Sequence, residues 1–500
     1  MPSSPCYDAI VIGAGIGGLV AATQLAARGA RILVLESYVI PGGSAGYFER
    51  DGYRFDVGAS MIFGFGQQGT TNLLTRALAA VDVSLSTIPD PVQIHYHLPQ
   101  GLDLRVHRDY EQFLQALIAH FPHEASGIRR FYNECWGIFN ALNRMELRSL
   151  EEPRYLARSF AHHPLACLRL ARYLPTNVGD LAHRHISDLQ LLRFIDMECY
   201  CWSVAPAART PAINAGMVLC DRHYGGINYP QGGVGQIALA LARGLERAGG
   251  EIRYKSRVRA ILTQGDQAAG VRLSTGEEFR ARRVISNATR WDTFEKLLPA
   301  EGMPRAERRW RQRYRKSPSF INLHLGVRAE CIPPETDCHH ILLEDWQQME
   351  APEGTLFVSI PTLLDSSLAP PGRHIVHAFT PSWMADWPQQ SRSAYRAQKA
   401  AAAQRAIARL EQLFPGLETS IEHQEVGTPR THQRFLNRDE GTYGPVPQRK
   451  LPGLLPMPFN RTAVPGLYCV GDSTFPGQGL NAVAFSGVAC AHRVAVDLGL

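Results

Sequence analysis

Several features that define specialised protein classes are missing from this chain of 500 residues. No apolar run approaches the roughly 20 residues that a membrane-spanning helix needs. A strand is expected almost at once, in "CYDAIVIGAG", which leaves no room for the charged start and apolar core of a signal peptide. We also find no organellar transit peptide, internal repeat or low-complexity segment. These absences favour a globular protein of the bacterial cytoplasm.

A disulfide framework and a metal site are likewise not indicated. The ten cysteines contain no CxxC pair, and Cys199 and Cys201 stand too close together for an easy disulfide or a zinc half-site. The adjacent pairs His162-His163 and His339-His340 are poorly spaced for a metal on one helix face. We therefore expect reduced, mostly buried cysteines in a reducing compartment and no metal.

The charge excess is small, at +6, and charged residues make up 20% of the chain against 45% apolar residues. This composition is that of an ordinary globular protein and excludes a disordered one. The charge gives no reason to expect a nucleic-acid partner, although it would favour an anionic membrane surface. The length permits a large core and more than one domain.

A βαβ unit opens the chain. A buried strand from Tyr7 to Gly13 precedes a helix over Gly17 to Arg28, and "ARILVLE" forms a second strand. The turn between strand and helix fits GxGxxG, with a glycine for the tight turn, one for the approach of a pyrophosphate and one for close packing of the helix. Glu36 ends the second strand, where a carboxylate binds a ribose. The pattern predicts dinucleotide binding; the alternative is a tight turn that binds nothing.

A second glycine-rich turn, "GLYCVGDSTFPGQGL", lies near the other end of the chain. Asp472 ends its strand, where a carboxylate suits a ribityl chain. The start of the following helix, near Leu480 to Ala482, suits the electron-accepting end of a flavin. The two turns together predict one FAD. "PQGGVGQ" at 230–236 lacks the third glycine and is better explained as a helix-capping loop than as a nicotinamide site.

The nucleotide-like segments are scattered along the chain, at its start, middle and end. We predict an α/β fold with a Rossmann-type FAD-binding domain assembled from residues 1–88, 220–292 and 425–500. Residues 89–219 and 293–424 would form an inserted α+β substrate domain, with strand-like "SFINLHLGV" and a long alanine-rich helix over 391–414.

These segments, in this order, resemble the FAD-dependent amine oxidase and phytoene desaturase superfamily, whose fold is like that of glutathione reductase. "PGGSAGYFERDGYRFDVGAS" resembles its second motif, although Ser44 stands where many members carry arginine, which departs from the amine oxidase pattern. A more specific resemblance is to the carotenoid isomerase (prolycopene isomerase) family, and it spans nearly the whole chain. It rests on "VLESYVIPGGSAGYFERDGY", "CYCWSV", "GGINYPQGGVGQIALAL", "TPRTHQRFLNRDEGTYGP" and "LYCVGDSTFPGQG".

This resemblance implies FAD contacts at the matching positions, with Val258 contributing its backbone near the adenine. Together with their neighbours in each motif, the predicted contacts are Gly13, Ala14, Gly15, Ile16, Gly17, Gly18, Glu36, Ser37, Gly42, Gly43, Ser44, Gly58, Ala59, Ser60, Met61, Val258, Gly471, Asp472, Gly479, Leu480, Asn481 and Ala482. No cysteine or histidine stands beside the last turn in a flavin-linking pattern, so we expect the FAD to be non-covalent.

The resemblance also implies an enzyme that converts poly-cis lycopene to all-trans lycopene with reduced FAD. The reaction is redox-neutral, because any electron lent to the polyene must return. An FAD-dependent carotenoid desaturase and a retinoid-type saturase share the nucleotide motifs and remain alternatives, as does a non-enzymatic binding protein like the GDP-dissociation inhibitors. The catalytic residues are unknown, and Glu198, Asp196 and Glu425 are only guesses at a general acid.

A hydrophobic polyene substrate partitions into lipid, so the enzyme is expected to associate peripherally with a bilayer such as a photosynthetic membrane. The segment at 151–177, "EEPRYLARSFAHHPLACLRLARYLPTN", mixes arginines with leucines and predicts a membrane-surface segment. The alternative is a pair of helices with solvated arginines. Tyr200 and Trp202 either line a polyene channel or belong to the core.

Overall fold

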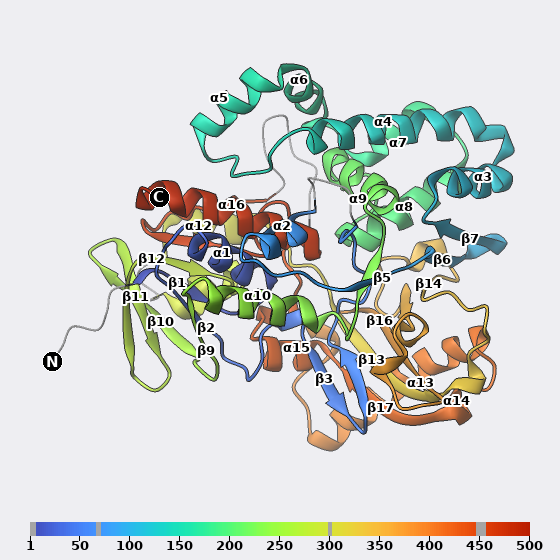
Figure 1. The fold of residues 1–500 in the computed structure, drawn as a ribbon. Coiled ribbons are helices and arrows are strands. Elements are labelled where there is room, and N and C mark those ends of the chain that lie inside the picture. The colour runs from blue at the N-terminus through green and yellow to red at the C-terminus, as the bar shows by residue number, and fades with distance from the viewer. Residues whose placement is uncertain (1–6, 67–71, 299–302, 447–456) are drawn as a thin grey trace.

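Two seven-stranded sheets organise the computed structural model, which describes residues 7–66, 72–298, 303–446 and 457–500. Figure 1 shows the first sheet beside the long C-terminal helix and the second sheet on the opposite side of the molecule, with a group of helices above it. Among the helices in these ranges, none combines the length and apolarity needed to cross a bilayer.

The first sheet has the strand order β10-β11-β12-β1-β2-β9, with β18 paired to β12. Its central strands are parallel, and Ala9 to Ile12 in β1 are all buried, as expected for a parallel strand covered on both faces. The strands are β1 (Tyr7–Ile12), β2 (Ile32–Leu35), β9 (Glu251–Arg253), β10 (Val258–Gln264), β11 (Gln267–Leu273), β12 (Glu278–Ser286) and β18 (Leu467–Cys469).

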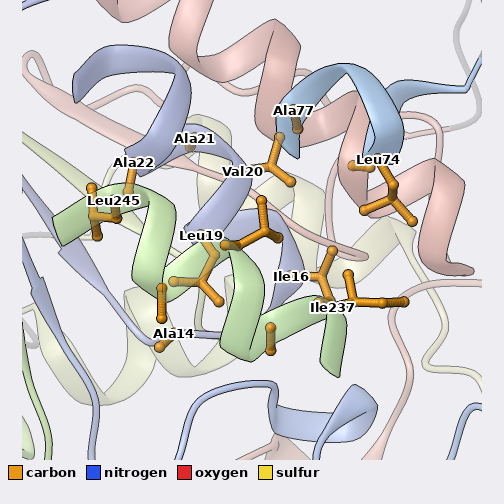
Figure 2. Packing of buried hydrophobic residues seen from close by; sticks show 14 of the residues in the cluster. Ala14, Ile16, Leu19, Val20, Ala21, Ala22, Leu74, Ala77, Ile237 and Leu245 are labelled. Atoms are coloured by element: carbon orange, nitrogen blue, oxygen red, sulfur yellow. The ribbon is translucent and has the colours of Figure 1, made fainter. Parts of the chain in front are cut away.

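Two helices that begin at the glycine-rich turns pack closely against each other, α1 (Ile16–Ala26) and α16 (Leu480–Leu498). A Cβ at Gly487 of α16 would lie only 2.7 Å from the carbonyl oxygen of Gly17, so the contact needs glycine. Helices α2 (Leu73–Ala79) and α10 (Gly235–Arg247) complete this core, in which Leu19, Ile237 and Leu245 are buried (Figure 2).

The second sheet has the order β17-β13-β16-β15-β14-β6-β7 and is antiparallel except where β14 pairs with β6. Its strands are β6 (Val92–Leu98), β7 (Leu102–His107), β13 (Ser319–Arg328), β14 (His339–Leu342), β15 (Leu356–Ser359), β16 (Arg373–Ser382) and β17 (Ile421–Gly427). The long helix α13 (Arg392–Leu413) buries Ala403, Ala406 and Leu410 in a cluster with this sheet.

Two smaller pairings connect the parts. The hairpin of β3 (Tyr47–Arg50) and β4 (Tyr53–Asp56) turns at Asp51 and Gly52, both with positive φ, as a two-residue hairpin turn requires. Strand β5 (Thr87–Pro89) pairs with β8 (Asn228–Pro230). The short helices outside the main layers are α11 (Arg290–Asp292), α12 (Arg305–Arg313), α14 (Leu417–Ser420) and α15 (Pro429–Leu436).

A helical region with its own core stands above the second sheet (Figure 1). It consists of α3 (Tyr110–His120), α4 (Ala125–Asn143), α5 (Pro153–His162), α6 (Pro164–Tyr173), α7 (Val178–His185), α8 (Leu189–Ser203) and α9 (Ala212–Tyr224). Inside this core Arg222 and Glu198 form a completely buried ion pair, and the Tyr96 hydroxyl donates to Glu198 at 2.5 Å.

The predicted fold class, a Rossmann-type α/β unit with an α+β insertion, is confirmed. The division into two domains stays a prediction. Strand β17 runs across the expected boundary at 425, and its pairing with β13 places the whole strand in the second sheet. The nine cysteines in the described ranges are free and mostly buried, and Cys6 lies outside those ranges.

Candidate functional site

A cavity of about 910 Å³ lies where the two sheets meet. One side is formed by residues that follow β1, β2, β12 and β18, and the other by residues of β13, β16 and β17. Ligands of open α/β sheets bind outside the carboxyl ends of the parallel strands, so this position is that of a nucleotide site.

The first glycine-rich turn forms a cradle of backbone at the edge of this cavity. Gly13 has φ +92°, which favours glycine, and its N–H donates to the Leu35 carbonyl at 2.8 Å. A Cβ on Gly15 would lie 2.6 Å from Nδ2 of Asn287, the residue that follows β12. A side chain at position 15 would therefore have to displace the Asn287 amide, which glycine avoids.

Glu36 lines the cavity and is only 8% exposed. Its Oε2 accepts from the Ala14 N–H at 2.7 Å, while its Oε1 accepts from the Tyr38 N–H at 2.7 Å and from the Ser37 hydroxyl at 3.1 Å. The carboxylate thus ties the ends of β1 and β2 together, and Oε2 keeps a lone pair for a ribose hydroxyl.

Asp472 lines the cavity beside an arginine that the sequence did not indicate. Its carboxylate forms an ion pair with Arg438, whose Nε donates to the Thr442 carbonyl at 2.5 Å and whose guanidinium lies over the Tyr443 ring at 5.0 Å. Arg438 follows α15, inside the motif "TPRTHQRFLNRDEGTYGP", which alone could have drawn attention to it.

Several buried polar atoms of the cavity wall have no hydrogen-bond partner in the described residues. They are Oγ of Ser44, Nε1 of Trp202, Oδ1 of Asn322, Nε2 of His432 and Nε2 of Gln478. Buried polar atoms are nearly always hydrogen-bonded, so these atoms point to a polar ligand in the cavity. The glycine cradle, the two carboxylates and these donors and acceptors fit FAD.

An aromatic surface lines the part of the cavity next to the second sheet. The Phe320 ring meets Phe379 edge-on at 5.2 Å and Tyr443 at 5.3 Å, and Trp202 packs on Phe63 at 4.4 Å. Such a wall suits an apolar ligand and excludes water. Tyr200, which was considered together with Trp202, does not line the cavity and is buried in the helical core.

Two neutral histidines also line the cavity. His324 Nε2 donates to the Asp56 carbonyl at 2.9 Å, and burial lowers the pKa of His324 to about 4. His432 Nδ1 lies 3.0 Å from the Tyr443 hydroxyl, and burial together with Arg438 lowers the pKa of His432 to about 3. Neither histidine stood out in the sequence, because both are ordinary members of a strand and a short helix.

The predicted FAD contacts fall into two groups. Those that line the cavity are Gly13, Gly15, Ile16, Gly17, Glu36, Ser37, Gly42, Gly43, Ser44, Gly58, Ala59, Val258, Gly471, Asp472, Gly479 and Leu480. Those outside its wall are Ala14, Gly18, Ser60, Met61, Asn481 and Ala482. Some of the latter have partners within the protein: a Cβ on Gly18 would lie 2.4 Å from the Gly13 carbonyl oxygen, and the Ser60 hydroxyl meets His377 Nδ1 at 2.9 Å. The contacts with FAD themselves stay predictions.

Of the three carboxylates considered as a general acid, only Glu425 lines the cavity, with Arg50 at 3.8 Å. Glu198 is buried against Arg222, and Asp196 Oδ1 accepts from the Ala207 N–H at 2.9 Å, so both have structural roles.

The loop before α10 is held by protein carboxylates, since the Val234 N–H donates to Asp56 at 2.9 Å and the Gly232 N–H to Asp365 at 2.6 Å.

Comparison with known proteins agrees with this site. Residues 16–495 match the family described as flavin containing amine oxidoreductase. The chain is 60% identical over 496 residues to the chloroplastic prolycopene isomerase of Arabidopsis thaliana, covering 99% of this chain and 83% of that protein. It is 27% identical over 515 residues to a neurosporene-forming phytoene desaturase of Cereibacter sphaeroides, covering 96% and 93%. The crystal structure of an oxidoreductase from Methanosarcina mazei has the same fold, with a TM-score of 0.63 at 19% identity over 98% of this chain and 99% of that one.

The comparison corrects the predicted location. A bacterial cytoplasmic protein was expected, but the relatives at about 60% identity are chloroplastic proteins of plants. Composition and charge could not reveal this, because a folded core carries no physical mark of the organism or compartment in which it works. By its match over nearly the whole length to these relatives, the chain belongs to the prolycopene isomerase family of flavin-containing amine oxidoreductases.

Proposed function

We propose that this chain is an FAD-dependent isomerase that converts poly-cis lycopene to all-trans lycopene, with the flavin in its reduced form. The observation that carries the proposal is the 60% identity over 99% of the chain to a protein named prolycopene isomerase. The phytoene desaturase is related at only 27%, so an isomerase is favoured over a desaturase or a saturase.

The FAD would be held from both glycine-rich turns. The backbone around Gly15 would accept the pyrophosphate, Glu36 a ribose, and Asp472 with Arg438 the hydroxyl-rich part of the cofactor. Burial raises the pKa of Cys201, which lines the cavity, well above its ordinary value, so its sulfur is a thiol and a poor nucleophile. This supports non-covalent binding.

The chain's own residues would position the polyene and control protons. Bound reduced flavin supplies the electron density that lowers the order of a double bond and so permits rotation. Phe320, Phe379 and Trp202 offer an apolar wall for the polyene. Neutral His432 would hold or pass a proton at Nε2, with its ring oriented by the Tyr443 hydroxyl.

Helices α5 and α6 support contact with a lipid surface. Helix α5 has no buried residue, and the exposed side chains include Leu165 at 81%, Leu168 at 58% and Phe160 at 52%. Arg154, Arg158, Arg169 and Arg172 are exposed on the same two helices. An apolar surface with arginines around it suits an anionic bilayer, from which a water-insoluble substrate would be drawn.

The test is an anaerobic assay of photoreduced holoenzyme with poly-cis lycopene in liposomes, with products resolved by chromatography and electrons counted per turnover. We expect all-trans lycopene without net consumption of reductant, because the two isomers have the same oxidation state. Oxidised enzyme under the same conditions is the control and should be inactive. If each product molecule consumed or released an electron pair, the protein would be a saturase or a desaturase.

A further inference from the structure

Three histidines meet on one face of the second sheet, outside the cavity. His95 and His97 are two residues apart in β6 and therefore point to the same face, and His340 of β14 is the direct neighbour of His95. Their ring centroids are 4.1 Å apart for His95 and His97, and 5.3 Å apart for His97 and His340. One nitrogen of each of the three histidines lies within 4.8 Å of the others.

The hydrogen bonds of the outer nitrogens fix where the protons are. His97 Nδ1 lies 2.8 Å from Oδ2 of Asp103, and His340 Nε2 lies 2.8 Å from the carbonyl oxygen of Asp337. An ionised carboxylate and a backbone carbonyl can only accept hydrogen bonds. Both outer nitrogens therefore carry hydrogen and donate.

The inner nitrogens then face each other without a proton between them. In the neutral form each ring carries a single hydrogen, which the outer nitrogen holds. A neutral imidazole that donates from one nitrogen has only a lone pair on the other. His97 Nε2 and His340 Nδ1 lie 3.1 Å apart, so two lone pairs point at one another.

A metal ion is the natural partner for such a pair. Two imidazole nitrogens bound to one tetrahedral zinc at about 2.0–2.1 Å lie about 3.3 Å apart. Ligating histidines commonly donate their other nitrogen to a carboxylate or a backbone carbonyl, as His97 and His340 do here.

Charge and access at the cluster are also suitable. Asp103 and Asp337 supply two carboxylates against one guanidinium, that of Arg105, whose Nε lies 2.8 Å from Asp337. The Asp103 side chain is 55% exposed and that of His97 is 22% exposed, which leaves a route from solvent. His95 lies between the carboxylates, with Nε2 at 2.7 Å from Asp103 and Nδ1 at 3.1 Å from Asp337.

We propose that His97 and His340 bind a divalent transition metal ion, with zinc the best match to imidazole ligands, and that His95 holds Asp103, the hydrogen-bond partner of His97, in place beside them. Such an ion would link β6 to β14, two strands that are paired at only three positions. His97 and His340 are 243 residues apart in the chain, so the ion would join distant segments. The expected role is structural, because the cluster is not part of the cavity wall.

The experiment uses full-length holoenzyme prepared without a polyhistidine tag, treated with a chelator and titrated calorimetrically with Zn²⁺. We expect one equivalent per chain and a higher melting temperature with zinc. The double variant His97→Gln/His340→Gln should lose this binding, and His95→Gln should weaken it by about 10–100-fold. The matched control is His162→Gln/His163→Gln, an adjacent pair outside the cluster, which should bind zinc like the unmodified chain.

A second measurement does not depend on the folding of a variant. Co²⁺ added to the unmodified chain should give the visible absorption bands of a tetrahedral site with nitrogen ligands, and Zn²⁺ should abolish them. Equal zinc binding by the unmodified chain and His97→Gln/His340→Gln would overturn the proposal. So would the absence of a stoichiometric event together with a featureless Co²⁺ spectrum.

Discussion

Single residues control the nucleotide cradle, and the limit at Gly15 is space. Its Cβ position lies 2.6 Å from Asn287 Nδ2, closer than real Cβ contacts come, and faces the place where the pyrophosphate is expected. Gly13 differs, because its limit is set by φ +92° and its Cβ would meet nothing closer than 3.8 Å. The two glycines thus serve the turn for separate reasons, space at one and backbone conformation at the other.

We predict that Gly15→Val abolishes FAD binding, because the side chain fills the cradle and displaces Asn287. The measurement is the flavin absorbance per chain of the purified protein. The control is Gly137→Val in α4, where a Cβ would meet only the guanidinium end of Arg169, at 3.5 Å. Normal flavin content in Gly15→Val would refute the assignment of this turn.

At the scale of elements, helices α5 and α6 differ from the rest of the molecule in their exposed apolar side chains. Four of the large hydrophobic residues that are exposed in the described ranges belong to these two helices: Leu156, Phe160, Leu165 and Leu168. Figure 1 shows the pair projecting from the helical region, away from the second sheet. An apolar surface of this kind marks an interaction site.

We predict that Leu165→Ser/Leu168→Ser weakens binding to anionic liposomes by at least about tenfold, since each buried leucine side chain contributes about 1.5–3 kcal/mol to insertion. Co-sedimentation with vesicles that contain anionic phosphatidylglycerol measures the loss of binding. Leu189→Ser is the control, because Leu189 is 78% exposed but lies at the start of α8. Equal loss of binding in the control would show that exposure alone, and not this surface, matters.

On the scale of the whole molecule, buried histidines couple folding to pH. Burial lowers the pKa of His324 and His339 to about 4 and that of His340 and His432 to about 3, below the ordinary 6.5. The unfolded chain therefore binds more protons than the folded one between about pH 6.5 and 4, and the stability from these groups is lost as the pH falls. Burial raises the pKa of Asp56 and Asp90 to about 7, which acts in the opposite direction over much of the same window.

Because the histidines outnumber the two carboxylates, we predict that the free energy of unfolding falls between pH 6.5 and 4. Each histidine contributes at most about 1.4 kcal/mol per pH unit. Urea unfolding followed by tryptophan fluorescence at several pH values measures the slope. His339→Gln, which removes one of these groups outside the cavity, should flatten the slope by up to that amount. A slope that is zero or of the opposite sign would contradict the prediction.

The sequence by itself determined the elements whose signals are local. Glycine spacing and the apolar run in β1 defined the first turn, and the alanine-rich stretch over 391–414 defined α13. Backbone conformation and strand burial depend on a few adjacent residues, so these elements can be predicted from short stretches. The resemblance of the motifs, read in order along the chain, added the fold and the family.

Only the tertiary structure decided which distant residues share a site. Arg438 is 34 residues from Asp472 in the chain, and Asn287 is hundreds of residues from Gly15. No local sequence pattern joins either pair. The histidine cluster is the sharpest case: His339-His340 looked unsuited to a metal on a helix, but β14 is a strand whose register sets His340 beside His95. Side chains that meet through sheet order and register are fixed by the packing of the whole chain, which no short stretch of sequence contains.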